Sequence, residues 1–362
     1  MFVSFELPLF IAWLALSSLL PGAILSFSLL RKEELTKLEK LFIGFGLGII
    51  LLPLIPFILY LVLGVKFSYT IALVSVAALY IMAIAALFIS RAYEGIRLPK
   101  EGLNLALPET PMAALKTYGV AICLLLLIVS GYMIRISTYS PVFQELDPYF
   151  YTDTAQQLLT MGENPWNDQT SWYPEVEVNH RIIPALSYLE ATWYSLYSSG
   201  GEYNNMLLAV IASMYPPIAA VLAIFFIYLL VSAAAGREWG VVSAGIAAFV
   251  PTFIYKLTAG EQEVQPYAFF ALTFFFAMYI LSLKKGGMKF PVLAGISFAA
   301  VALGSSSQIL AVIAVIIFSM VQAVLLFVRD KDAAGLKELL HINLIVFLTG
   351  PLLGSAILKD VF

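Results

Sequence analysis

Charged residues are scarce in this chain of 362 residues: Asp, Glu, Lys and Arg make up 12%, against 61% hydrophobic residues. The mean hydropathy of +0.92 is far above that of a soluble domain. A net charge of −3 excludes the basic surface of a nucleic-acid-binding protein. With one cysteine, Cys123, and two histidines, the sequence has no disulfide framework and no cysteine- or histidine-rich metal site. A metal site would therefore need carboxylates.

Long apolar runs are the dominant feature of the sequence. A transmembrane helix needs about 20 mostly apolar residues, and ten runs approach that length. The sequence therefore predicts an all-α, polytopic integral membrane protein with about ten transmembrane helices. The runs are 8–30, 41–63, 68–90, 117–135, 206–233, 238–256, 265–283, a closely spaced pair within 290–328, and 339–358.

The distribution of basic residues predicts the orientation in the membrane. Alternate loops hold 15 of the 20 Lys and Arg residues. Because basic residues accumulate on the cytoplasmic side, these loops are expected to be cytoplasmic and both termini external. The other side has only Lys66, Arg135, Arg181, Lys256 and Lys359.

One long loop, 136–205, is expected on the outer face. The segment from Pro148 to Met161 is typical of a short helix with proline in its first turn. In a second segment, from Ile182 to Tyr197, apolar residues recur at helical spacing and Glu190 lies on another face. This pattern predicts an amphipathic helix, either interfacial or re-entrant.

Two acidic groups stand where expected helices meet the outer membrane surface. One is Glu145 with Asp147, after the fourth run, and the other is Glu261 with Glu263, between the sixth and seventh. Carboxylates from both groups could bind one divalent cation, which prefers oxygen ligands and can bridge to phosphate. The alternative is that these acids only cap the helices that begin near Pro148 and Pro266.

Several motifs resemble the catalytic subunit of oligosaccharyltransferase, a C-type polytopic glycosyltransferase. The stretch 147–151, D-P-Y-F-Y, resembles the family's G-x-D-P-Y-Y at the start of the first external loop. N-P-W-N at 164–167 and S-W-Y-P at 171–174 are similar to the loop of archaeal members. The stretch 256–263, K-L-T-A-G-E-Q-E, is similar to the family's second catalytic loop. The resemblance covers roughly residues 117–330, so 1–116 is interpreted as an added N-terminal module of three helices and 117–362 as the glycosyltransferase-like domain.

The resemblance implies roles for individual residues. Asp147 would bind Mg²⁺ or Mn²⁺ and contact the acceptor, also as a candidate base, and Glu263 would be the ligand from the second loop. Glu261 would join them if it replaces a missing second acid. Lys256 or Arg181 would contact donor phosphate, with snorkelling as the alternative for Lys256. Two further residues are candidate loop contacts: Tyr149, which could instead belong to an aromatic belt, and His180, which could instead be an ordinary hydrogen-bonded loop residue.

The chain also departs from the family pattern. Glu145 stands where the family usually has glycine, and Gln265 where the second loop has a second acid. No W-W-D motif is present, and the sequence reaches Phe362 directly after an apolar run. It is therefore expected to be either a piece of a longer protein or a short relative with a different acceptor.

The implied function is transfer of a sugar or glycan from a polyprenyl or dolichyl phosphate or pyrophosphate carrier to a protein or glycan acceptor. The expected place is the outer face of a prokaryotic, archaeal-type plasma membrane, in contact with lipid. One alternative is a non-catalytic subunit that binds lipid-linked glycan. A lipid or glycan transporter is another, although a proton-coupled transporter would have ionisable residues at mid-span, and here they lie near the ends of the runs.

Overall fold

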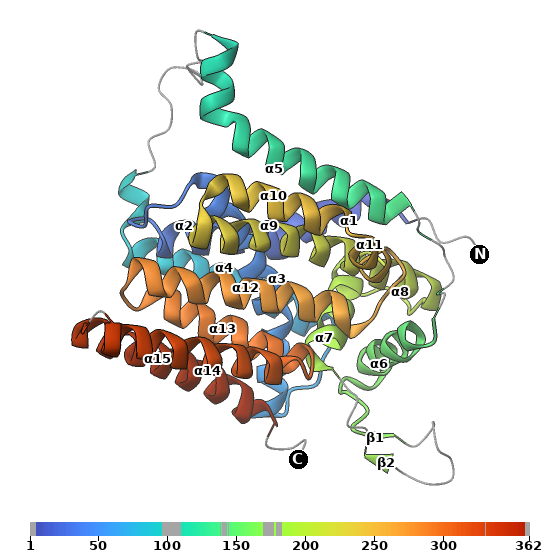
Figure 1. Ribbon diagram of the computed structural model, residues 1–362. Coiled ribbons are helices and arrows are strands. Elements are labelled where there is room, and N and C mark those ends of the chain that lie inside the picture. The colour runs from blue at the N-terminus through green and yellow to red at the C-terminus, as the bar shows by residue number, and fades with distance from the viewer. Residues whose placement is uncertain are drawn as a thin grey trace.

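The computed structural model describes residues 5–95, 110–137, 139, 143, 145–168, 177–178, 183–329 and 331–358, and these are almost entirely helical (Figure 1). The first helices are α1 (Leu7–Leu14), α2 (Leu20–Leu29), α3 (Lys37–Leu63) and α4 (Tyr69–Ile89), with a π-helical turn at Ala15–Leu19 and a 3-10 turn at Ala92–Gly95. They are followed by α5 (Pro111–Ser137), α6 (Asp147–Met161), α7 (Pro184–Tyr197), α8 (Asn205–Ala212), α9 (Tyr215–Ala235), α10 (Arg237–Phe249), α11 (Pro251–Lys256), α12 (Val264–Lys285), α13 (Lys289–Gly304), α14 (Gln308–Val324) and α15 (Ala333–Leu358), with a π-helical turn at Leu325–Arg329. Two short strands, β1 (Asn167–Asp168) and β2 (Glu177–Val178), pair antiparallel.

Eight helices in the described part of the chain are long and apolar enough to cross a membrane. Two of the ten expected spans do not reach that length as single helices. The run 238–256 is divided into α10 and α11 at Pro251, and α13 has only 16 residues. Proline at position 251 lacks the amide hydrogen that would continue α10, which explains the break. The predicted class is confirmed, and the count of ten is not.

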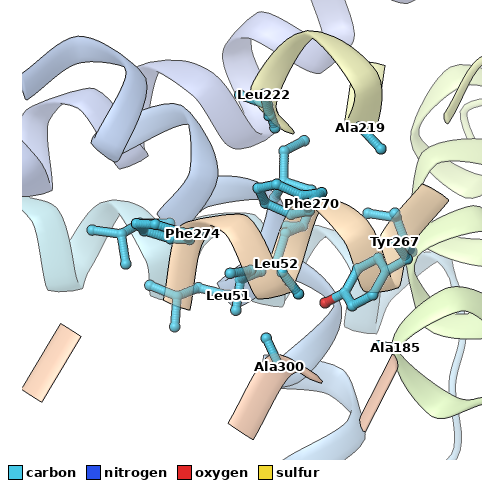
Figure 2. Packing of buried hydrophobic residues seen from close by; sticks show 14 of the residues in the cluster. Leu51, Leu52, Ala185, Ala219, Leu222, Tyr267, Phe270, Phe274 and Ala300 are labelled. Atoms are coloured by element: carbon cyan, nitrogen blue, oxygen red, sulfur yellow. The ribbon is translucent and has the colours of Figure 1, made fainter. Parts of the chain in front are cut away.

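Helices α9, α12 and α13 pack together in the interior, and α3 joins them. Phe226 of α9 stacks on Phe274 of α12 with ring centroids 4.3 Å apart, and Phe42 of α3 stacks on Phe225 of α9 at 4.1 Å. Figure 2 shows Phe270 and Phe274 beside side chains of α3 and α9. The early helices therefore share one hydrophobic core with the later ones.

Helix α7 lies inside the protein and not on the membrane surface, which was one of the two positions predicted for it. Every residue from Pro184 to Leu196 is buried, including Glu190. A helix lying on the membrane surface would expose one face, so the interfacial alternative is wrong. The cause is that α1, α3 and α4 also pack on this helix. Tyr188 contacts the rings of Phe57 in α3 and of Phe67 between α3 and α4, and Trp193 contacts Phe10 of α1.

Candidate functional site

Three carboxylates from two distant segments of the sequence meet at one end of the helical bundle. Glu145 immediately precedes α6, and Glu261 and Glu263 lie in the loop between α11 and α12. One oxygen from each lies within 4.8 Å of the others. We call Glu145, Glu261 and Glu263 the acidic cluster. The prediction that the two acidic regions lie close together therefore agrees with the geometry, with Glu145 as the member from the first region.

Lys256, the last residue of α11, is the cation of this cluster. Its Nζ lies 3.0 Å from Oε2 of Glu145, 3.3 Å from Oε1 of Glu263 and 3.9 Å from Oε2 of Glu261. Tyr255 also donates a hydrogen bond to Glu145, at 2.9 Å. Glu261 and Glu263 are almost inaccessible, whereas the side chains of Lys256 and Glu145 are about one-third exposed, at 33% and 34%. The cluster is therefore open to solvent on the side of Lys256 and Glu145.

The backbone of the second acidic loop is held at several points. The carbonyl of Arg135, at the end of α5, accepts hydrogen bonds from the Ala259 amide at 3.0 Å and the Thr258 hydroxyl at 2.7 Å. Gly260 has φ +96°, a conformation that L side chains rarely adopt. The Tyr215 hydroxyl donates to the backbone carbonyl of Glu263. These contacts fix the loop against α5 and α9.

The three carboxyl groups of the cluster have different pKa values. Hydrogen bonds from Glu263, Lys256 and Tyr255 lower the pKa of Glu145 to about 2. Burial, together with the hydrogen bond to Glu145, raises the pKa of Glu263 to about 7. Burial also raises the pKa of Glu261. Burial alone would lower the pKa of Lys256, but Glu145 and Glu263 outweigh it and raise that pKa. Near neutral pH, Glu263 is thus poised between its protonated and ionised forms.

A second group of side chains lies on the other side of the same loop. Gln262 donates to Oε2 of Glu190 in α7 and accepts from the hydroxyl of Thr152 in α6. Glu190 and Gln262 have no exposed surface. Burial raises the pKa of Glu190 well above its usual value, so its neutral form is favoured. We call Glu190, Gln262 and Thr152 the inner network.

The predicted site residues fall into three groups. Glu261, Glu263 and Lys256 come together in the cluster. Asp147 and Tyr149 lie in the first turn of α6 and are exposed, so Asp147 is beside the cluster in sequence but is not one of its three carboxylates. The last two candidates, His180 and Arg181, lie outside the described residues.

Sequence reasoning missed part of this arrangement. It placed Glu145 in the first acidic group but named Asp147 as the metal ligand of that group, and it did not assign Glu190 a contact. An available signal was Glu190 as the one residue of a charged type in the helix 184–197, since an acid among mostly apolar residues needs a partner when it is buried.

Comparison with known proteins places this helical fold and its acidic loops in a family. The family model "Oligosaccharyl transferase STT3, N-terminal" matches residues 115–358. The class is therefore that of polytopic membrane proteins related to glycosyltransferases. The chain belongs to the oligosaccharyl transferase STT3 family.

Among curated relatives, the rice dolichyl-diphosphooligosaccharide–protein glycosyltransferase subunit STT3A is 32% identical over 186 residues, which is 49% of this chain and 23% of the relative. The STT3 subunit of Dictyostelium discoideum is 26% identical over 171 residues, 46% of this chain and 24% of the relative. The chain thus spans about a quarter of the length of the curated relatives it matches.

Solved structures of the archaeal oligosaccharyltransferase AglB from Archaeoglobus fulgidus have a similar fold. A complex with an inhibitory peptide and dolichol-phosphate aligns with a TM-score of 0.58 and 21% identity, over 66% of this chain and 29% of AglB. A complex with Zn and sulfate aligns with a TM-score of 0.56 and 20% identity, over 64% and 30%. At this level of identity the likeness establishes the fold.

Proposed function

We propose that this chain forms the membrane-embedded catalytic part of an oligosaccharyltransferase. In this proposal it transfers a glycan from a polyprenyl or dolichyl phosphate or pyrophosphate carrier to a protein acceptor. The observation that carries the proposal is the convergence of Glu145, Glu261 and Glu263 on one point at an end of the bundle. Family membership and the AglB complexes with dolichol-phosphate and peptide support the substrate classes.

The acidic cluster fits a divalent cation such as Mg²⁺ or Mn²⁺. All three side chains offer oxygen ligands, which these ions prefer. Oε2 of Glu261 is buried and has no hydrogen-bond partner among the described residues, so it is available as a ligand. Once all three carboxylates are ionised, they also carry more negative charge than Lys256 can neutralise. Glu261 and Glu263 would hold the cation, together with Glu145 and with Asp147 as the resemblance implies.

A bound cation would supply compensation for the charge that develops on the phosphate leaving group. The residues of the chain do the remaining work. Lys256 would turn from the carboxylates toward the donor phosphate, because its side chain is partly exposed and its Nζ already lies against the acidic cluster. Asp147, exposed at the start of α6, would face the acceptor and hold or accept its proton. Displacement at the anomeric carbon would break its bond to the phosphate oxygen and form the bond to the acceptor.

The proposed place of reaction is the outer face of an archaeal-type plasma membrane. The division of basic residues between loops supports this orientation. Cysteines introduced at Glu202 and Met288, both exposed, in a Cys123→Ser background would test it. An impermeant thiol reagent added to intact cells should label residue 202 and spare residue 288. Equal labelling of the two sites would contradict the orientation.

The enzymatic proposal is tested by transfer from a lipid-linked glycan to an Asn-Val-Thr peptide, the sequon tethered in one AglB structure. Wild type should transfer with Mn²⁺ and lose activity with a chelator. Asp147→Asn should abolish transfer while thermal stability stays near wild type, because Asp147 is exposed and the N-cap of α6 is Leu146, without a side-chain capping hydrogen bond. Asp147→Glu should be nearly as inactive, because one extra methylene displaces the carboxylate from an aligned reaction.

A non-catalytic role has a different signature in the same experiment. Wild type would then bind lipid-linked glycan without metal-dependent transfer, and Asp147→Asn would bind it equally well. That combination would contradict the enzymatic proposal and favour a non-catalytic subunit that binds lipid-linked glycan.

A further inference from the structure

Glu190 is a buried carboxyl group with no part in the proposed chemistry. It lies in the middle of α7 with no exposed surface. Its Oε2 accepts a hydrogen bond from Gln262, and its Oε1 has no hydrogen-bond partner within the described ranges. No Lys, Arg or His in that part of the chain forms an ion pair with it. Burying an apolar side chain at this position would cost less free energy than burying a carboxyl group. What a carboxyl group adds here is the hydrogen bond that it accepts from Gln262.

Gln262 stands between the two acids of the second loop. Its amide is held at both ends, by Glu190 of α7 and by Thr152 of α6. The Thr152 hydroxyl also lies 2.8 Å from the Pro148 carbonyl, in the first turn of α6. The Glu263 amide donates to the Glu261 carbonyl at 2.9 Å, so residues 261–263 form a tight turn with Gln262 at its centre. The Gln262 side chain reaches the inner network, while Glu261 and Glu263 on either side of it meet Glu145 in the acidic cluster.

The helix that carries Glu190 is itself firmly held. The Tyr188 ring lies 5.3 Å from that of Phe57 in α3 and 5.8 Å from that of Phe67, and Trp193 packs edge-on against Phe10 of α1 at 5.7 Å. These contacts come from the N-terminal helices, which precede the residues that match the family model. Glu190 is therefore a fixed point against which the second acidic loop can be oriented.

We propose that Glu190 is a positioning residue that, through Gln262, orients Glu261 and Glu263 for cation binding. The N-terminal helices serve the same end by holding α7 in place. The inference rests on the proposed function, because it requires that the acidic cluster binds a cation. Partners behind metal ligands commonly fix the direction of those ligands and contribute substantially to affinity.

The test compares three variants of the whole chain in detergent. Glu190→Leu removes the acceptor, Glu190→Gln keeps a carbonyl that can accept from Gln262, and Thr192→Val is the matched control. Thr192 is also fully buried in α7, and its hydroxyl has no hydrogen-bond partner in the described part of the chain. Binding of Mn²⁺ is measured by electron paramagnetic resonance, and order of the loop by hydrogen exchange at residues 258–263 without metal.

Glu190→Leu should weaken Mn²⁺ binding by about 10- to 100-fold and accelerate exchange at residues 258–263. The Gln variant and the Thr192→Val control should stay within about twofold of wild type, since neither removes the acceptor for Gln262. If Glu190→Leu binds Mn²⁺ as tightly as Thr192→Val does, the positioning role is wrong and the cation site stands. If wild type binds no Mn²⁺, the proposed cation site fails, and this inference fails with it.

A double variant separates positioning from general damage. Glu190→Leu with Gln262→Leu removes both partners and leaves neither of their polar groups unsatisfied, so the melting temperature should recover relative to Glu190→Leu. Mn²⁺ binding should stay weak, because the anchor for the loop is still missing. Recovery of Mn²⁺ affinity together with stability would overturn the proposal.

Discussion

The acidic cluster and the inner network lie on opposite sides of one short loop. Each contains a buried glutamate, but the two glutamates have different surroundings. In the cluster, Glu263 faces Lys256 and two other carboxylates, and its pKa is raised only to about 7. In the inner network, Glu190 has neutral neighbours and no exposed surface, so burial favours its neutral form. Lys256 favours the ionised form of Glu263, and Glu190 has no such cation beside it among the described residues, so the two glutamates differ through their surroundings and not through residue type.

The largest expected effect comes from removing a charge on the cluster side. Glu263→Gln should weaken Mn²⁺ binding by more than about 100-fold, because the amide cannot supply the negative charge of a ligand. This loss is larger than the one expected for a residue that only positions a ligand, such as Glu190. Calorimetric titration of purified protein with Mn²⁺ measures this.

Glu163→Gln provides the control for this change. Glu163 is a half-exposed glutamate that pairs with Lys66 at 3.2 Å, away from the cluster. Its variant should bind Mn²⁺ like wild type. Equal losses in the two variants would show that Mn²⁺ responds to the overall charge of the protein and not to this cluster.

Much of the fold follows from hydropathy, because a bilayer requires long apolar helices with internally satisfied backbones. The predicted helices at 148–161 and 182–197 correspond to α6 and α7. The environment of α7 could not be deduced in the same way. Its apolar spacing fits both a membrane surface and a protein interior, and only the packing of α1, α3 and α4 decides between them.

The candidate site was predictable in part. Glu261 and Glu263 were identified from the second acidic loop and do converge with the first acidic region. That Glu145 completes the cluster depends on how the chain turns before α6, which local sequence does not determine. The contact between Glu190 and Gln262 joins residues 72 positions apart, and no periodicity links them.

An intermediate effect is expected from pH. Because Glu263 has a pKa of about 7 without metal and must lose its proton to bind a cation, protons compete with Mn²⁺ below that pH. Affinity should fall about tenfold for each pH unit from about 7 down to 5 and change little from 8 to 9. Mn²⁺ titrations at these pH values measure the slope. A flat profile would contradict the raised pKa of Glu263 and remove the contrast with Glu190.

The smallest of these effects is expected at Lys256, whose charge the cation must displace. Lys256→Gln removes the positive charge that lies 3.0 to 3.9 Å from the three carboxylates. At pH 8 we expect Mn²⁺ to bind roughly fivefold more tightly, since a partly exposed ion pair contributes about 1 kcal/mol. Transfer from the lipid-linked donor should nevertheless fall, because the same side chain is proposed to contact the donor phosphate. Tighter Mn²⁺ binding with undiminished transfer would keep Lys256 as a counter-ion of the cluster and exclude it from the donor site.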